Sequence, residues 1–133
     1  MKLLIVEDNA RMRKLIKSLV QEFADEIFEC SDGSEVFTAY RLHRPDWVLM
    51  DIEMTHMDGI TASQHLIQSF PSAQIIIVTK YDDDNLRQEA RLAGACGYVL
   101  KEDLLALRGI LTHKPPVANP QCLNHLQCIT NRK

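Results

Sequence analysis

Five short apolar runs along the chain are separated by stretches in which apolar residues recur at helical spacing. The runs are continuous rather than alternating, as in LLIV, WVLM and IIIV, which is typical of central strands covered on both faces. Strands are therefore predicted at residues 2–6, 27–30, 46–50, 74–78 and 97–100. Strands that alternate with amphipathic segments predict an α/β fold with a doubly wound parallel sheet.

Residues suited to helix caps follow the first two strands. Asn9 is a good N-cap for a first helix, whose apolar stripe consists of Met12, Leu15, Ile16, Leu19, Val20 and Phe23. Ser34 is expected to cap a second helix, and Pro45 lies in the segment that leaves it.

The later helices carry similar boundary signals. Asp58-Gly59 is expected to open the third helix, and the acidic run 82–84 suits the N-terminus of a fourth. Gly94 is placed to end that helix at its C′ position. A fifth helix is expected over residues 102–111, which gives a (βα)5 chain.

The charge is unevenly distributed along the 133 residues. All 18 acidic residues lie before residue 113, together with 12 of the 15 Lys and Arg residues, a net charge of −6. A body of that sign lacks the cationic face that phosphate binding needs, so direct nucleic-acid binding is not expected. Because no stretch is long and apolar enough to span a bilayer, we expect a cytoplasmic protein without a membrane partner.

Residues 113–133 depart from the pattern, with three prolines and no sustained periodicity. We therefore expect one domain over residues 1–112 and a Pro-containing tail over 113–133 that forms no separate domain. Four side chains of the tail could in principle bind zinc: His113, Cys122, His125 and Cys128. Their spacing does not match the usual structural zinc patterns, which favours a weakly packed tail.

Polar residues follow the predicted strands. Glu7 and Asp8 come after the first strand, Asp51 after the third, Thr79 at the fourth and Lys101 after the fifth. In an open parallel sheet, ligands bind outside the carboxyl ends of the strands. We therefore expect these five residues, far apart in sequence, to converge at one edge.

The residue types at this edge suit phosphoryl transfer. Clustered carboxylates repel one another unless a cation lies among them, and a hard, oxygen-ligated ion such as Mg²⁺ or Mn²⁺ suits them. A carboxylate beside that ion can attack phosphorus to give an acyl phosphate. The Lys101 ammonium and the Thr79 hydroxyl are suited to the phosphoryl oxygens. Taken singly, Glu7-Asp8 is more simply a solvated turn and Thr79 a strand end, so the combination carries the interpretation.

Four motifs in order resemble those of response-regulator receiver domains, the phospho-accepting part of two-component signalling. The motifs are VEDN (6–9), LMDIEMTHMDG (49–59), VTKYDDD (78–84) and GACGYVLKED (94–103). The resemblance covers residues 1 to about 112 and implies a flavodoxin-like (βα)5 sheet with strand order 2-1-3-4-5. The segment GYVLKE is most similar to receivers that precede helix-turn-helix output domains.

The resemblance also implies residue roles at the metal site. Asp51 would be the phosphorylation site and would share direct ligation of the metal with Asp8. Glu7 would hold the metal through water, and the main-chain carbonyl of Glu53 would complete the protein ligands.

Three further residues would act on the phosphoryl group and on the response to it. Lys101 would pair with the phosphoryl oxygens, and Thr79 and Tyr98 would form a switch pair that alters the surface of the fourth helix, fifth strand and fifth helix. The implied partners are a sensor histidine kinase or phosphotransfer protein, and an output partner of unknown identity or a second copy of the chain. The chain would be a signalling phosphoacceptor that assists its own phosphorylation and dephosphorylation, not an enzyme.

Two positions depart from the family pattern. Thr55 stands where receivers usually have proline, so the loop after Asp51 is expected to be less rigid. Glu102 stands where proline often follows the lysine, and because a non-proline cis bond costs about 3 kcal/mol, none is expected there.

Two other functions compete with a stand-alone receiver. The chain could be the receiver fragment of a DNA-binding transcription regulator whose output domain is lacking. DIEMT, which begins at Asp51, also resembles the DxDxT motif of aspartate-nucleophile phosphatases. Glu53 at the second acidic position argues against the phosphatase.

Overall fold

The computed structural model describes residues 1–112, which form one parallel sheet with helices on both faces. The strands are β1 (Lys2–Val6), β2 (Glu26–Cys30), β3 (Trp47–Met50), β4 (Ile75–Thr79) and β5 (Gly97–Leu100). They pair in the order β2-β1-β3-β4-β5. This confirms the predicted fold and strand order, and the predicted strand ends lie within one residue of the observed ones.

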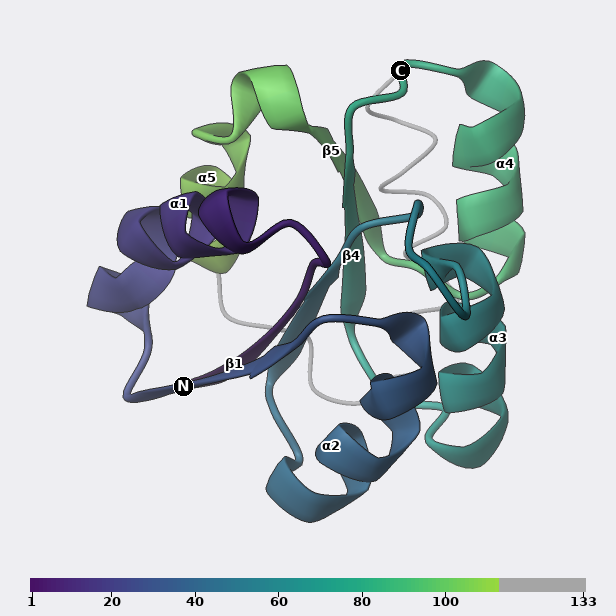
Figure 1. Ribbon diagram of the computed structural model, residues 1–133, viewed down its shortest axis with the longest axis horizontal. Helices are drawn as coiled ribbons and strands as arrows, with labels where there is room; N and C mark the ends of the chain where they lie inside the picture. The colour runs from purple at the N-terminus through teal and green to yellow at the C-terminus, as the bar shows by residue number, and fades with distance from the viewer. Residues whose placement is uncertain (113–133) are drawn as a thin grey trace.

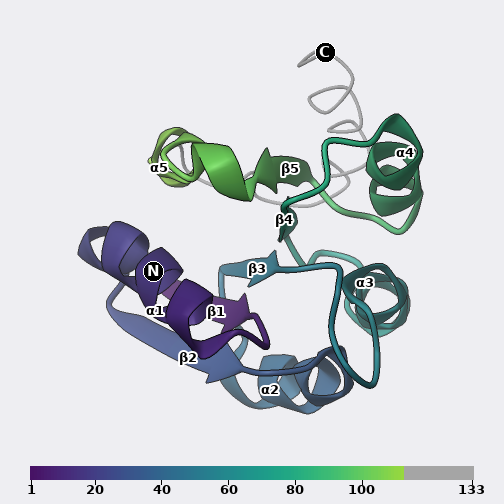
Figure 2. The same ribbon diagram turned by 45° about the horizontal axis from the view of Figure 1, so that its top comes forward.

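The helices divide into two layers. One face of the sheet is covered by α1 (Ala10–Val20) and α5 (Ala106–Leu111), as Figure 1 shows. The opposite face is covered by α2 (Val36–His43), α3 (Gly59–Ser69) and α4 (Asp84–Leu92). The turned view in Figure 2 also shows the two layers apart, with α1 and α5 on one side of the strands and α2, α3 and α4 on the other.

Alternate strand residues supply the two cores. Leu3 and Ile5 of β1 pack in the cluster that contains α1 and α5, whereas Leu4 and Val6 pack in the cluster that contains α2, α3 and α4. All of these side chains are buried. Two buried faces explain why the strands read as continuous apolar runs.

Side-chain caps start three of the helices as the sequence predicts. Asn9 accepts a hydrogen bond from the Met12 amide at 2.9 Å, and Asp58 accepts one from the Thr61 amide at 2.8 Å. The third cap comes from the acidic run: Asp83 accepts from the Leu86 amide at 2.9 Å. Gly94 follows α4 with a φ of 105°, the left-handed conformation expected at C′.

Two expected helix starts were wrong. Ser34 is not the cap of α2; instead its amide donates to Asp32 at 2.9 Å, and a short 3-10 turn, η2 (Gly33–Glu35), leads into the helix. Asp32 has an extended backbone, and its carboxylate reaches the Ser34 amide at the start of the turn. The fifth helix starts later than predicted because the 3-10 turn η3 (Lys101–Asp103) precedes it.

A third 3-10 turn, η1 (Gln21–Phe23), leads from α1 toward β2.

Over residues 1–112, no helix is long and apolar enough to cross a bilayer. The predictions for residues 113–133, including the tail boundary and the zinc alternative, lie outside the described residues.

Candidate functional site

Strand register brings the first two predicted acids together. Val6 of β1 is paired with Met50 of β3, so the next residues, Glu7 and Asp51, leave the sheet side by side. The Asp51 amide donates to the Val6 carbonyl at 3.0 Å, which continues the ladder by one residue. The strands thus hold both carboxylates rigidly at the carboxyl edge of the sheet.

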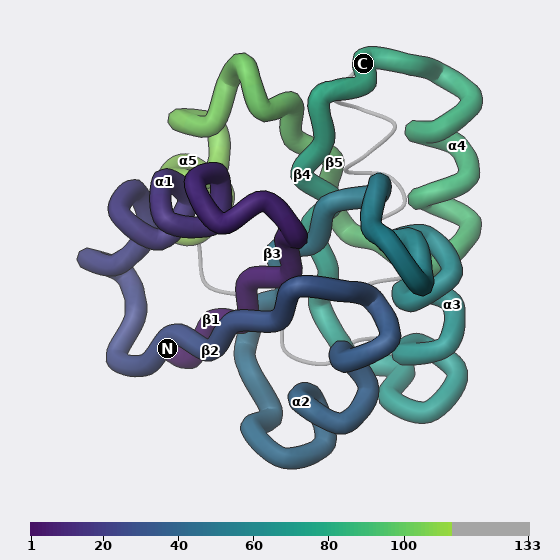
Figure 3. The backbone as a smooth tube through the Cα atoms, in the orientation of Figure 1, coloured from purple at the N-terminus to yellow at the C-terminus, as the bar shows by residue number. Residues whose placement is uncertain are grey.

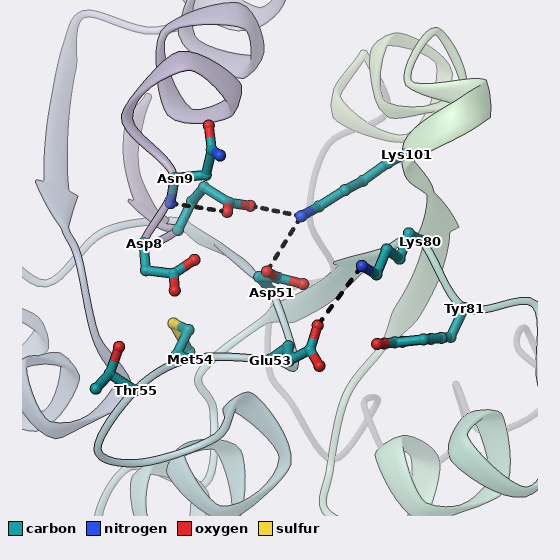
Figure 4. A pocket seen from close by; sticks show the side chains of 10 residues that line it. Asp8, Asn9, Asp51, Glu53, Met54, Thr55, Lys80, Tyr81 and Lys101 are labelled. Atoms are coloured by element: carbon teal, nitrogen blue, oxygen red, sulfur yellow. Dashed lines mark hydrogen bonds and ion pairs between the residues drawn. The ribbon is translucent and has the colours of Figure 1, made fainter.

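A pocket of about 410 Å³ opens at this edge. Four of the five residues expected to converge from the strand ends line it, as does Glu53. The whole lining consists of Glu7, Asp8, Asn9, Asp51, Glu53, Met54, Thr55, Lys80, Tyr81 and Lys101. Figure 4 shows Asp51 in the middle of the group, with Lys101 extended toward it and Asp8 on the neighbouring wall. The convergence expected from the order of strands is therefore present for Glu7, Asp8, Asp51 and Lys101, but Thr79 does not line the pocket.

Lys101 is shared between two carboxylates. Its Nζ lies 2.9 Å from Oε1 of Glu7 and 3.1 Å from Oδ2 of Asp51. The contact with Glu7 is an ion pair without hydrogen-bond alignment, whereas the ammonium does donate a hydrogen bond to Asp51. One cation therefore bridges the ends of β1 and β3 from the end of β5.

Burial dominates the electrostatics of the two bridged acids. Asp51 is 5% exposed and Glu7 1% exposed. Burial raises the pKa of Asp51 although Lys101 opposes the shift, and it raises the pKa of Glu7 in the same way. For Lys101, burial would lower the pKa, but its contacts with Glu7 and Asp51 raise it. The lysine therefore stays charged while both acids remain under-compensated.

The acids form a donor set for a metal ion. One carboxylate oxygen from each of Glu7, Asp8 and Asp51 lies within 4.8 Å of the others. Asp8 is exposed, so an ion could reach the cluster from solvent. Hard carboxylate oxygens with an open side suit Mg²⁺ or Mn²⁺, which prefer oxygen ligands and retain several waters.

A second ion pair stands at the mouth of the pocket. Nζ of Lys80 lies 3.8 Å from Oε1 of Glu53, and both side chains are 64% exposed. The Tyr81 ring lies beside this pair in Figure 4, and contact with Glu53 raises the pKa of Tyr81. These side chains link the loop after β3 to the loop after β4.

Thr79 and Tyr98 are connected through the main chain of Tyr81. Thr79 is fully buried and does not line the pocket. Its Oγ1 accepts a hydrogen bond from the Tyr81 amide at 3.3 Å, while the Tyr98 hydroxyl donates to the Tyr81 carbonyl at 2.7 Å. The Arg87 guanidinium covers the Tyr98 ring at 4.6 Å, and burial raises the pKa of Tyr98 to about 12.

Gly59 lets α3 begin against the end of β3. Its amide donates to the Ile52 carbonyl at 2.8 Å. A Cβ at this position would lie 1.9 Å from the Asp51 carbonyl oxygen, far inside van der Waals contact. The absence of a side chain at residue 59 thus allows the turn that fixes the main chain of Asp51.

Sequence reasoning missed some contacts of the site. The Asn9 amide donates to Oε2 of Glu7 at 3.1 Å, although the sequence suggested only a helix cap for Asn9. Met54 and Thr55 line the pocket without a chemical signal that would reveal it. Asp32 lies outside the pocket but holds the loop after β3; the pair Asp32-Gly33 signals a turn but not this contact with a distant loop.

Comparison with known proteins agrees with this geometry. Residues 3–111 match the family profile described as "Response regulator receiver domain". The chain is 38% identical over 101 residues to the transcriptional regulatory protein PdtaR of Mycobacterium tuberculosis, covering 75% of this chain and 49% of that protein. It is 37% identical over 101 residues to the chemotaxis protein CheY of Bacillus subtilis, covering 75% of this chain and 84% of CheY.

A solved structure extends the likeness to three dimensions. The crystal structure of a two-component response regulator of the LuxR family from Aurantimonas sp. superposes with a TM-score of 0.75 at 27% identity, covering 98% of this chain and 96% of that one. This match agrees with the predicted similarity to receivers of that kind. The chain spans about half the length of PdtaR, so features of the longer protein do not transfer with the alignment.

Proposed function

This chain belongs to the response-regulator receiver domain family, and we propose that its Asp51 accepts a phosphoryl group from the phosphohistidine of a sensor histidine kinase or phosphotransfer protein. Receiver domains are signalling phosphoacceptors rather than enzymes in the ordinary sense. The observation that carries the proposal is the shared cation: Lys101 contacts Asp51 and Glu7, with Asp8 beside them. We place this activity in the cytoplasm.

The reaction forms an acyl phosphate on Asp51. A carboxylate oxygen attacks phosphorus, the P–N bond of the phosphohistidine breaks, and the imidazole leaves with the bonding pair. Mg²⁺ or Mn²⁺ would be held by Asp8, Asp51 and the Glu53 carbonyl, with Glu7 acting through water, and would neutralise the phosphoryl oxygens. Lys101, already 3.1 Å from Asp51, stays to pair with a phosphoryl oxygen.

The switch follows from the contacts of Tyr81. Once a phosphoryl group is present, the Thr79 hydroxyl donates to one of its oxygens and gives up its contact with the Tyr81 amide. The Tyr98 hydroxyl, bonded to the carbonyl of the same residue, then shifts with it. The result is a population shift at the surface of α4, β5 and α5, read by an output partner or by a second copy of the chain.

A second candidate is a receiver that acts within a DNA-binding regulator. The match to PdtaR, named a transcriptional regulatory protein, and to a LuxR-family response regulator favours this alternative. The phosphorylation chemistry would be the same, and the output would be a DNA-binding domain instead of a separate partner.

The experiment is phosphorylation with a small donor such as phosphoramidate, read by intact mass. With Mg²⁺ the wild type should gain one phosphoryl group, and chelation of the metal should prevent it. Asp51→Asn should gain none, whereas Asp58→Asn, a conservative change at an exposed cap in the same loop, should be labelled like the wild type. Labelling of Asp51→Asn, or no labelling of the wild type, would refute the proposal.

A further inference from the structure

A third buried carboxylate, besides Glu7 and Asp51, lies beside the site and plays no part in the chemistry above. Asp32, between β2 and η2, is 5% exposed. Its Oδ1 accepts from the His56 amide at 2.8 Å, and its Oδ2 accepts from the Met57 amide at 3.2 Å and the Ser34 amide at 2.9 Å. Asp32 therefore ties its own loop to the loop after β3.

The main chains of the two loops are in direct contact. A Cβ at Gly33 would lie 2.3 Å from the Met57 carbonyl oxygen, so this approach needs a residue without a side chain. In Figure 3 the blue turn after β2 runs alongside the teal loop of residues 51–58. That loop carries Glu53 and Thr55, both of which line the pocket.

The tether is ionic in character. Burial raises the pKa of Asp32, but hydrogen bonds from the amides of His56, Ser34 and Met57 outweigh it and hold the pKa at about 2. An ionised acceptor makes shorter and stronger hydrogen bonds than a neutral one. The ionised Asp32 carboxylate thus holds the loop after β3 at His56 and Met57, the end of the loop that is farther along the chain from Asp51.

We propose that Asp32 is a positioning residue for the metal site, holding residues 52–58 so that the Glu53 carbonyl is already placed for Mg²⁺. The inference rests on the proposed function. A loop that is ordered before binding loses less conformational entropy when the ion binds, which raises affinity. Thr55 occupies a position where receivers usually have proline, and Asp32 supplies from outside the loop the rigidity that a proline would supply from within.

The test compares the Mg²⁺ affinity of two conservative variants. Each variant is titrated with Mg²⁺, and binding is measured by calorimetry or from amide chemical shifts. Asp32→Asn keeps the shape of the side chain but has one acceptor oxygen, and we expect about tenfold weaker Mg²⁺ binding, the lower end for outer-shell partners of metal sites. Asp46→Asn is the control, because Asp46 also accepts a main-chain hydrogen bond, from the Lys2 amide at 2.7 Å, before β3 at the opposite edge. Its Mg²⁺ affinity should match that of the wild type.

Amide hydrogen exchange at His56 and Met57 gives a readout independent of metal. Both amides should exchange faster in Asp32→Asn, and faster still in Asp32→Ala, which removes every acceptor. Wild-type Mg²⁺ affinity in either variant despite faster exchange would overturn the inference, as would unchanged exchange in both. Because wild-type Mg²⁺ binding and Asp51 labelling are measured first, failure of the proposed function is recognised separately.

Discussion

Asp51 and Asp32 are equally buried, each 5% exposed, yet their surroundings shift their pKa values in opposite directions. Asp32 receives hydrogen bonds from three main-chain amides. Asp51 receives one from the Ile52 amide, shares Lys101 with Glu7, and faces the negative charge of Asp8. Burial alone therefore does not decide the protonation of a carboxylate; the donors aimed at it do.

The difference separates a structural carboxylate from a chemical one. The charge of Asp32 is satisfied within the protein and holds two loops together. The charge of Asp51 is under-compensated, which fits the proposed binding of a cation and the proposed attack on phosphorus. Under-compensated acids in a pocket are typical of functional sites, and four predictions probe this contrast.

The largest effect is expected at Gly59, whose close approach fixes the main chain of Asp51. In Gly59→Ala the new Cβ would lie 1.9 Å from the Asp51 carbonyl oxygen, so α3 or β3 must shift. We expect the free energy of unfolding to fall by about 3 kcal/mol in urea denaturation. In Gly109→Ala, within α5, the new Cβ would have no neighbour within 4 Å. The free energy of unfolding of this variant should instead rise by about 0.5–1 kcal/mol. Equal stabilities for the two variants would contradict the close approach.

The Asp32 tether should lose its effect in acid. Its pKa is about 2 in the folded chain against 3.8 for the free side chain, so the stabilisation is complete above about pH 4 and disappears as the pH falls toward 2. Urea denaturation at a series of pH values should show the wild type more stable than Asp32→Asn by on the order of 2 kcal/mol at pH 7. The gap should close between pH 4 and pH 2, and a gap that does not depend on pH would contradict an ionic tether.

The charge of Asp51 should affect folding stability in the opposite direction to that of Asp32. Because its pKa is raised, the ionised carboxylate destabilises the folded state at neutral pH, and protonation relieves this as the pH falls through the raised value. Asp51→Asn should therefore be more stable than the wild type by about 1 kcal/mol in metal-free buffer at pH 7, while Lys101 keeps Glu7 as its partner. The advantage should shrink in acid. Greater stability of the wild type at pH 7 would show that Lys101 fully compensates both acids.

The smallest effect is expected for the pair at the pocket mouth. Lys80 and Glu53 are 3.8 Å apart and both well exposed, so solvent screens their attraction. Lys80→Ala should change the free energy of unfolding by less than about 0.5 kcal/mol. A larger loss would mean that the loops after β3 and β4 depend on each other for their order.

Much of the fold followed from local sequence. Continuous apolar runs require burial on both faces of the sheet, and the alternation with helices requires parallel strands, so the edge where polar residues meet could be predicted. Glu7, Asp8, Asp51 and Lys101 do meet there. The roles of these residues and the binding of a metal ion remain predictions.

Other contacts were beyond local reasoning because they join distant segments. Asp32 bonds to amides 24 and 25 residues away, and an amide carries no side-chain signature in a sequence. The same reach explains the misplaced cap, since Ser34 is the residue type preferred there but its amide is the donor. Thr79 was expected to face the site, and its burial beneath the Tyr81 main chain depends on the course of the following loop.

The link between Thr79 and Tyr98 runs through the amide and carbonyl of Tyr81 and not through its ring. Every amino acid except proline offers the same two main-chain groups, so the connection does not require a tyrosine side chain at residue 81. A substitution at residue 81 would therefore change the ring at the pocket mouth while the two main-chain hydrogen bonds to Thr79 and Tyr98 could still form.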